Sequence, residues 1–328
     1  MKNNFYTLSK TFALIFAIVF TLAACKNNPK QSAPEETATS TEPFFKLSLA
    51  QWSIHRTIQE DGMSPYDFAQ KASEWGFEGL EYVNQLYSDV MQSEDKDAAI
   101  AAFVEKNNAL TKQYGMTNVL IMIDNEGDLS ASDEAVRQEA IVNHKRWVKA
   151  ASEMGCQAVR LNLYGEKDPE KWVANSTKSL SEISDYAAAM NVNVMVENHG
   201  RITSNIPLLL EAITATGKSN CGLLPDFGNF CMAEEGYGSI FDGSCANVYD
   251  PYLGVSQMLP HAFGVSAKSY NFNEAGNETF IDYRRMLELV KKSGYNGFIG
   301  VEYEGNNLPE TEGIKATQNL LLRLAGEI

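Results

Sequence analysis

Three acidic residues stand where apolar, strand-like runs of the sequence stop. Glu197 ends Val-Met-Val-Glu, Asp226 ends Leu-Leu-Pro-Asp, and Glu302 ends Ile-Gly-Val-Glu. The carboxyl ends of parallel strands meet at one face of a β/α barrel, where such enzymes keep their chemistry. The pattern therefore predicts a ring of carboxylate oxygens, the ligands that a hard divalent ion prefers.

Apolar runs of this kind recur along the chain with helical segments between them. Ser64-Pro65 and Gly76 bracket one such helix, and Ser132 and Gly155 bracket another. Strict alternation predicts a parallel sheet, and eight units predict an α/β chain closed into a single-domain (β/α)8 TIM barrel. The alternative is a doubly wound open sheet, but no Gly-x-Gly-x-x-Gly turn follows any run. The predicted strands are Lys46–Trp52, Gly79–Val83, Thr117–Ile123, Ala158–Tyr164, Val192–Glu197, Gly222–Asp226, Gly264–Lys268 and Gly297–Glu302.

Polar residues occupy alternate positions of the later runs. Because side chains alternate along a strand, one face of each run is aliphatic and packs on helices, while the other lines the barrel. The inner face of the predicted strands carries Glu81, Arg160, Asn162, Glu197, Ser266, Lys268, Glu302 and Glu304. A barrel whose polar inner residues gather at the strand ends is predicted to hold its site there.

The first 25 residues read as an export signal. Lys2 and Lys10 precede an apolar run from Phe12 to Leu22, which ends in Leu-Ala-Ala-Cys25. The run is shorter than the roughly 20 residues that a membrane span needs. The ending resembles a bacterial lipobox, which predicts that Cys25 is lipidated and begins the mature lipoprotein; a plain signal peptide is the alternative. Because Lys26 is not acidic, the periplasmic side of the outer membrane is the favoured address.

The composition bounds the rest of the chain. Residues 26–43 are polar and rich in Pro, Ser, Thr and Glu, which predicts a flexible tether before a barrel at 44–328. A net charge of −15 argues against nucleic acid as a partner. Cys156 and Cys221 are predicted core residues. Cys231 and Cys245 are expected to be free thiols, with a bridge between them as the alternative.

Four segments carry a resemblance to a known family: VENHG at 196–200, LPDFGNF at 224–230, SAKSYNF at 266–272 and GVEYEG at 300–305. The chain resembles the sugar phosphate isomerase/epimerase family, the xylose isomerase-like TIM barrels. The resemblance implies a divalent metal (Mn, Mg, Co or Zn) held by Glu197, Asp226 and Glu302. Family members add a strand-seven histidine, where this chain has Ser266, and often a histidine after the strand-six aspartate, where it has Asn229. His199 shares the parity of Glu197 and is the candidate fourth ligand.

Each of these assignments has a simpler alternative. Lys268 and Arg160 could neutralise the three carboxylates in a metal-free salt-bridge cluster. His199 could be a loop histidine bonded to backbone. Lys268 is predicted to polarise a substrate oxygen, or else to pair only with Glu302.

The predicted substrate-binding residues also have two interpretations. Trp52 could stack on a sugar ring or plug the barrel mouth, and Glu81 could bind a hydroxyl or accept a bond from a neighbour. Asn162 and Asn198 could bind hydroxyls or form turns. His55 and His261 are expected to be ordinary surface or loop residues, and His144 to sit on a helix far from the strand ends. The predicted substrate-binding set is Trp52, Glu81, Arg160, Asn162, Asn198, Asn229, Ser266 and Glu304.

The function that this pattern predicts is metal-assisted isomerisation or epimerisation of a sugar or keto-sugar. Glu197 and Glu302 are the predicted pair that removes and returns the proton α to the carbonyl, with Lys268 beside the developing oxyanion. The same abstraction with a leaving group one carbon further on gives a keto-sugar or 3-keto-glycoside lyase or hydratase. A non-catalytic sugar-binding lipoprotein is the third hypothesis, because the strand-seven histidine is replaced.

Overall fold

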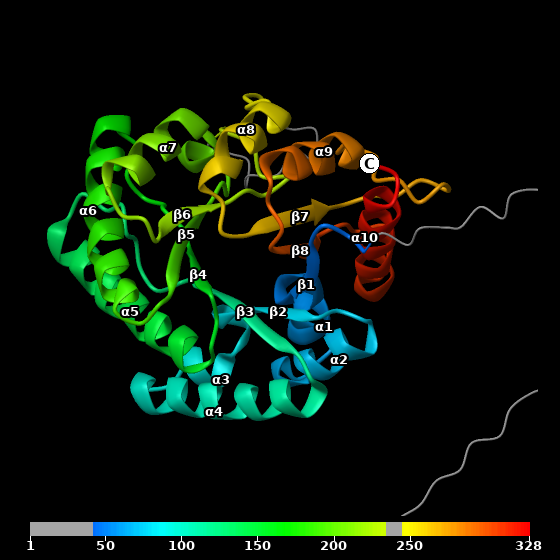
Figure 1. Ribbon diagram of the computed structural model, residues 1–328. Helices are drawn as coiled ribbons and strands as arrows, with labels where there is room; N and C mark the ends of the chain where they lie inside the picture. The colour runs from blue at the N-terminus through cyan, green and yellow to red at the C-terminus, as the bar shows by residue number, and fades with distance from the viewer. Residues whose placement is uncertain (1–41, 234–244) are drawn as a thin grey trace, which may run out of the picture. The chain divides into compact units, whose positions relative to one another are not determined.

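The strands form one parallel barrel in the computed structural model, which describes residues 42–233 and 245–328. Figure 1 shows the strands at the centre and the helices around them. The predicted strands and the TIM-barrel fold are confirmed, with small shifts of their ends. The strands are β1 Lys46–Ala50, β2 Gly79–Val83, β3 Thr117–Met122, β4 Ala158–Leu161, β5 Asn193–Glu197, β6 Cys221–Leu224, β7 Val265–Ser269 and β8 Phe298–Tyr303.

The ring closes between β6 and β7, at the place where the predicted site lies. The continuous ladders run in the order β6-β5-β4-β3-β2-β1-β8-β7. Two isolated parallel bridges, Leu223 to Ala262 and Asp226 to Ser266, join its free edges. The backbone N–H of Ser266 donates to Pro225 at 2.9 Å, and the N–H of Phe227 donates to Ser266 at 3.1 Å. The seam that closes the barrel therefore sets Asp226 directly beside Ser266.

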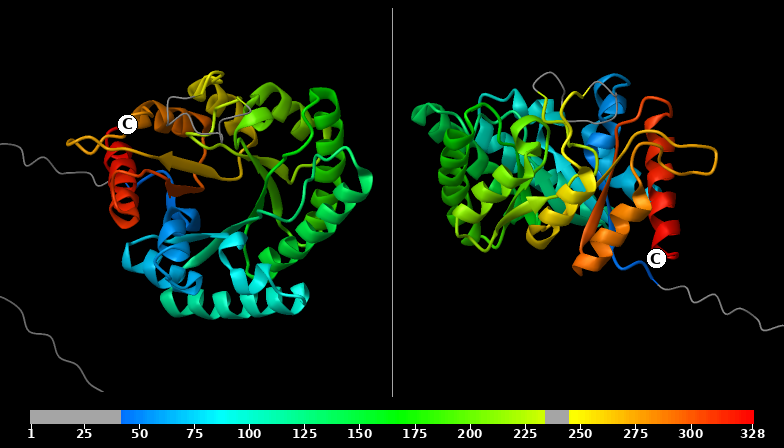
Figure 2. Two further views of the ribbon diagram at one scale, coloured as in Figure 1. Left: turned by 180° about the vertical axis from the view of Figure 1, so that it is seen from behind. Right: turned by 90° about the horizontal axis from the view of Figure 1, so that it is seen from above.

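Helices cover the outer face of the barrel, as the two further views in Figure 2 show. Aspartate side chains cap α4, α5, α6 and α9; the Asp133 carboxylate accepts from two N–H groups, so Asp133 and not Ser132 caps its helix. Gly155 and Gly294 follow helices with φ of 72° and 80°, a conformation that favours glycine. The helices are α1 His55–Gln59, α2 Phe68–Glu74, α3 Ser88–Met91, α4 Lys96–Tyr114, α5 Glu134–Glu153, α6 Pro169–Ala188, α7 Ile206–Ala215, α8 Pro251–Met258, α9 Tyr283–Ser293 and α10 Glu310–Ala325.

The core lies between the aliphatic faces of the strands and these helices. Val194 and Val196 on β5 and the indoles of Trp147 and Trp172 are fully buried. The alternation of side chains predicted from the sequence thus separates an apolar layer between strands and helices from a polar barrel interior. No helix within the described ranges is long and apolar enough to cross a membrane. Cys25 and the predicted signal and tether, up to residue 41, lie outside the described residues.

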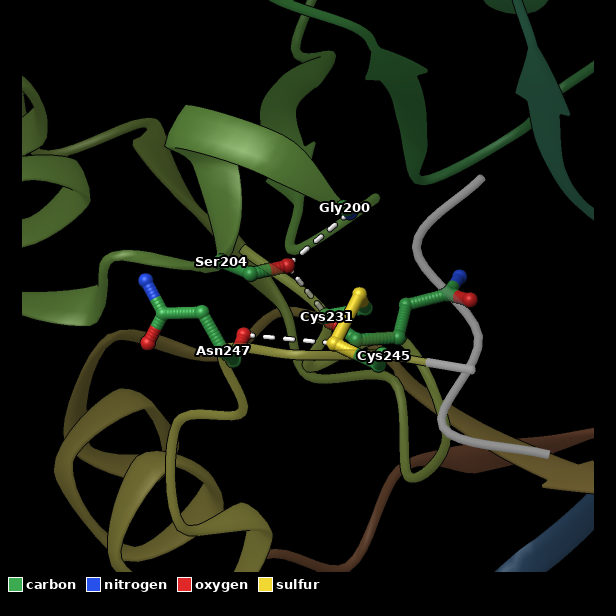
Figure 3. The surroundings of a disulfide bond; sticks show 6 residues. Gly200, Ser204, Cys231, Cys245 and Asn247 are labelled. Carbon is green, nitrogen blue, oxygen red and sulfur yellow. Dashed lines mark hydrogen bonds between the residues drawn. A yellow bond between two sulfur atoms is a disulfide. The ribbon is translucent and has the colours of Figure 1, made fainter. Parts of the chain in front are cut away.

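Cys231 and Cys245 form a disulfide (Figure 3), so the expectation of free thiols is wrong. The chain leaves β6, returns and pairs with itself: Cys231 bridges Val248 antiparallel, and the Met232 N–H donates to Asn247 at 2.8 Å. This pairing brings the two Cα atoms to 5.7 Å. Sequence spacing carries no signal of such a return. Cys156 and Cys221 are buried and free, as predicted.

Candidate metal and sugar site

Glu197, Asp226 and Glu302 lie together at the carboxyl ends of β5, β6 and β8. One oxygen of each carboxylate lies within 4.8 Å of an oxygen of the others, and all three residues are buried. The alternation of side chains turns Glu197 and Glu302 inward near the ends of their strands, and the seam between β6 and β7 places Asp226 beside them. The arrangement that the sequence predicts is therefore the arrangement that the fold builds.

Ser266 and Lys268 of β7 hold two of these carboxylates. The Ser266 hydroxyl lies 2.7 Å from Asp226 Oδ2 and 2.8 Å from Glu302 Oε2, so it can donate to either. The Lys268 ammonium lies 3.1 Å from Glu302 Oε1, 3.0 Å from Glu304 Oε1 and 3.7 Å from Asp226 Oδ2. Ser266, at the position of the family's histidine, thus links two members of the carboxylate group.

Glu197 has a separate set of partners. The Arg160 Nε lies 3.0 Å from Glu197 Oε2, and the Asn229 amide donates to Glu197 Oε1 at 3.1 Å. Arg160 also pairs with Asp124, whose Oδ1 lies 2.8 Å from its Nη1. Asp226 Oδ1 accepts from the backbone N–H groups of Gly228 and Asn229, both at 2.8 Å. Every carboxylate of the group is therefore oriented by at least one fixed donor.

These surroundings make the three carboxyls differ in acidity. Burial raises the pKa of Glu197 well above its usual range, against the opposing charge of Arg160. Burial raises the pKa of Asp226 to about 6, although Lys268 lowers it. For Glu302 burial also acts upward, but the Lys268 ammonium and the Ser266 hydroxyl outweigh it, so the pKa is lowered overall. Glu302 is thus the carboxyl most readily ionised of the three.

The donor set fits a divalent cation. Five carboxylates against two basic side chains leave three excess negative charges when all are ionised, and unpaired buried charge is costly. The three carboxylates and the Ser266 hydroxyl offer only oxygen, which suits a hard ion such as Mg²⁺ or Mn²⁺. The groups counted are Asp124, Glu197, Asp226, Glu302 and Glu304 with Arg160 and Lys268.

His199 lies beside this group without joining it. Its Nδ1 contacts the Tyr164 hydroxyl and lies 2.9 Å from Asn162 Oδ1, and its backbone N–H donates to Thr203 at 2.9 Å. Burial lowers the pKa of His199 to about 3, and the charges of Arg160 and Lys268 add to the effect. The imidazole is therefore neutral, and its role as a fourth ligand stays a prediction.

Two other predicted binders, Asn198 and Glu81, are buried and bonded to neighbouring residues. The Asn198 amide donates to the backbone carbonyls of Asp226 and Asn229, and its oxygen accepts from the Asp226 N–H, which matches the turn-forming alternative. Glu81 accepts from the Ser48 hydroxyl, and burial raises its pKa to about 8. Neither residue lines the cavity described next, so their binding of substrate hydroxyls stays a prediction.

A cavity of about 590 Å³ meets the carboxylate group at Glu302. Trp52 lines it, with its indole stacked on His55 at a centroid distance of 4.3 Å. The other predicted residues on its wall are Arg160, Asn162, His199, Asn229, Glu302 and Glu304. Most of the predicted binding set therefore shares one space.

Several residues of this wall were missed or misplaced by sequence reasoning. His144 lines the cavity, so the expectation that it lies far from the strand ends is wrong: α5 packs against the loop after β3, where Asn143 and Trp147 bond Glu126. Asp124, Gln85 and Glu126 also line it. The signal for Asp124 was present, because it follows Ile123 as Asp226 follows its own apolar run.

The fold and these residues agree with comparisons against known proteins. Residues 69–324 match the family described as the xylose isomerase-like TIM barrel. The chain belongs to this family. A local match of 36% identity over 75 residues, a fifth of either chain, links it to a C-glycoside deglycosidase alpha subunit from Arthrobacter globiformis. The chain thus shares only a short stretch with that curated relative.

Solved structures share the fold at low sequence identity. An E. coli 3-keto-D-glucoside 4-epimerase superposes with a TM-score of 0.62, at 12% identity, over 84% of this chain and 98% of its own. An L-ribulose 3-epimerase gives 0.64 at 16% identity, over 86% and 95%. A xylose isomerase-like protein from Mycobacterium smegmatis in complex with magnesium gives 0.59 at 14% identity, over 88% and 99%. The fold is therefore one that sugar epimerases use.

Proposed function

We propose that the protein is a metal-assisted isomerase or epimerase of a sugar or keto-sugar. The observation that carries the proposal is the convergence of Glu197, Asp226 and Glu302, with Lys268 in contact, in a group that reaches the wall of the cavity at Glu302. A divalent ion held by the three carboxylates would polarise a substrate carbonyl and its neighbouring hydroxyl. The named functions of the structural relatives support this reaction class.

Two carboxylates of this group can act as base and acid. Glu302 faces the cavity, and the Lys268 ammonium at 3.1 Å favours its ionised form, so it is placed to take the proton α to a carbonyl. Glu197, ordered by Arg160 and Asn229, would return a proton to the same carbon. Lys268 would balance the charge of the enediolate oxygen between the two transfers.

A second candidate is elimination from a keto-glycoside by the same first step. The local similarity to a C-glycoside deglycosidase subunit favours it. With a leaving group on the carbon next to the carbanion, the electron pair would expel that group instead of taking back a proton. Solvent-proton exchange without release of an aglycone favours epimerisation, and release favours elimination.

The cellular location of the protein is part of the same proposal. We infer export and lipid anchoring through Cys25, and the disulfide between Cys231 and Cys245 supports export, because such bonds persist in oxidising compartments. Cys25→Ser should leave an unprocessed or mislocalised precursor. A Cys25→Ser protein that is processed and fractionates with membranes as the wild type does would refute the anchor.

The enzymatic proposal is tested by metal analysis and isotope exchange on the domain that begins at residue 44. About one divalent ion per chain should be retained after incubation with Mn²⁺, Co²⁺ or Zn²⁺ and desalting. A panel of keto-sugars in D₂O should then show exchange of the carbon-bound α-proton. A folded domain that binds no ion and exchanges no proton would leave the sugar-binding lipoprotein as the better reading.

A further inference from the structure

His144 presents a neutral hydrogen-bond acceptor to the cavity. It is 2% exposed, and its Nδ1 lies 2.7 Å from the carbonyl of Ala140, one turn earlier on α5. That carbonyl can only accept, so Nδ1 carries the hydrogen and Nε2 keeps its lone pair. Within the described ranges no group bonds Nε2. Burial lowers the pKa of His144 to about 4, so the ring stays uncharged at neutral pH.

Glu126 places a second acceptor on the same wall. Its Oε1 accepts from the Trp147 indole at 2.7 Å, and its backbone carbonyl accepts from Asn143 at 3.3 Å. The other carboxylate oxygen has no partner among the residues that the structure describes. Gly127, at φ 99°, lies so close to Ala140 that an added Cβ would stand 2.9 Å from the alanine methyl. The loop is therefore packed firmly onto α5, and its two acceptors are held in place.

This wall lies across the barrel mouth from Asp226 (Figure 1), whereas Glu197 is linked to its near edge through Arg160 and Asp124. Glu126 belongs to the loop after β3, whereas the carboxylates come from β5, β6 and β8. Figure 1 shows β2 and β3 on the side of the ring opposite β6 and β7. A sugar ring that reacts at Glu302 would therefore leave the space beside His144 unfilled.

The size of the cavity agrees with this geometry. Even at the roughly 30 Å³ that liquid water allots to each non-hydrogen atom, the twelve such atoms of a hexose need only about 360 Å³. The cavity holds about 590 Å³. The remaining space, about 230 Å³, takes about seven more atoms on the same generous allowance, enough for the bare ring of a second sugar whose outer hydroxyls extend to the cavity mouth.

We propose that His144 and Glu126 form an outer subsite for a second polyhydroxylated ring, so that the substrate is a disaccharide-like keto-glycoside and not a single keto-sugar. Acceptors without their own donors recruit hydroxyl groups, and the acidic side chains nearby disfavour phosphate or carboxylate at this position. The inference rests on the proposed function, because it takes the reacting ring to lie at the carboxylates.

Binding calorimetry on the Mn²⁺-loaded domain tests the subsite with glucose and four disaccharides: cellobiose, maltose, trehalose and sucrose. Wild type should bind at least one disaccharide about tenfold more tightly than glucose. Glu126→Gln keeps an acceptor for Trp147 and turns the free acceptor into a donor, and His144→Asn keeps the bond to Ala140 while removing Nε2. Each change should raise the Kd of that disaccharide roughly five- to tenfold more than it raises the Kd of glucose. This ratio corresponds to the loss of one hydrogen bond.

The exposed Glu139 of α5 supplies the matched control, since Glu139→Gln makes the same chemical change away from the cavity and should alter neither Kd. The subsite is refuted if the variants weaken the binding of both sugars equally or of neither. It is also refuted if the wild type binds glucose but binds no disaccharide more tightly than glucose. Preferential disaccharide binding without any α-proton exchange would support the subsite and refute the proposed enzymatic function. Exchange on single keto-sugars with no disaccharide preference would support the enzymatic function and refute the subsite. If no sugar binds at all, both fall.

Discussion

Replacing Lys268 by methionine tests whether this ammonium and a metal ion share the same carboxylates. Lys268 is 1% exposed, and its three acidic neighbours raise its pKa well above the ordinary value despite burial, so it is charged in the folded protein. Methionine keeps much of the volume and removes the charge. Without an ion, Arg160 would be the remaining basic partner of the five carboxylates described above.

The magnitude follows from the three contacts. Glu304 is partly exposed, so its pair at 3.0 Å contributes little, and Asp226 is farther away at 3.7 Å. The pair with Glu302, buried on both sides at 3.1 Å, dominates. Removing one partner of such a pair costs about 3–5 kcal/mol. Lys268→Met should lower the free energy of unfolding in EDTA by that amount.

A bound ion should recover part of the loss. A ligand at a hundredfold excess over its Kd adds about 2.7 kcal/mol to the stability of any protein that binds it only when folded. Because the variant lacks a competing positive charge, it should bind Mn²⁺ at least tenfold more tightly, and the gap to wild type should narrow by about 1.4 kcal/mol or more.

Urea unfolding at pH 7 in EDTA and in Mn²⁺ measures both effects. The exposed Lys112→Met serves as the control and should change stability by less than about 1 kcal/mol. A cost below 1 kcal/mol for Lys268→Met in EDTA would show that the ammonium does not neutralise the cluster. If Mn²⁺ raised the free energy of unfolding of the wild type and of Lys268→Met by the same amount, the ion would bind elsewhere.

Three further changes test other parts of the structure. Glu302→Gln should leave the fold intact and weaken Mn²⁺ binding at least tenfold in calorimetry, because one charged ligand is lost; unchanged affinity would exclude Glu302 as a ligand. Glu81 has a folded pKa of about 8, above its unfolded value, so its contribution to stability is lost as pH rises from about 4.5 to 8. Glu81→Gln should therefore be more stable than wild type by about 3 kcal/mol at pH 7 and much less so at pH 5, and urea curves with no such pH trend would contradict the assignment. Reducing the bond between Cys231 and Cys245, 14 residues apart, should lower stability by about 3 kcal/mol, with the double serine variant insensitive to reductant.

The barrel and the carboxylates of its site follow from local rules of the sequence. Side chains alternate along a strand, so Glu197 and Glu302 at the strand ends had to point inward once eight strands alternated with eight helical segments. The same rule placed Arg160, Ser266 and Lys268 on the inner face, where the structure has them. These predictions depend only on the period of a strand and on the general topology of a parallel barrel.

Tertiary structure alone decided how the parts beyond the strand ends come together. The disulfide depends on a chain segment that leaves β6 and returns antiparallel, and no local pattern specifies that return. His144 reaches the cavity because Gly127 lets the loop after β3 pack tightly on Ala140 of α5. The face that a helix turns to a barrel mouth is set by packing between residues distant from the strand ends. Strand parity is a property of neighbouring residues, whereas loop closure and helix docking are properties of the whole chain.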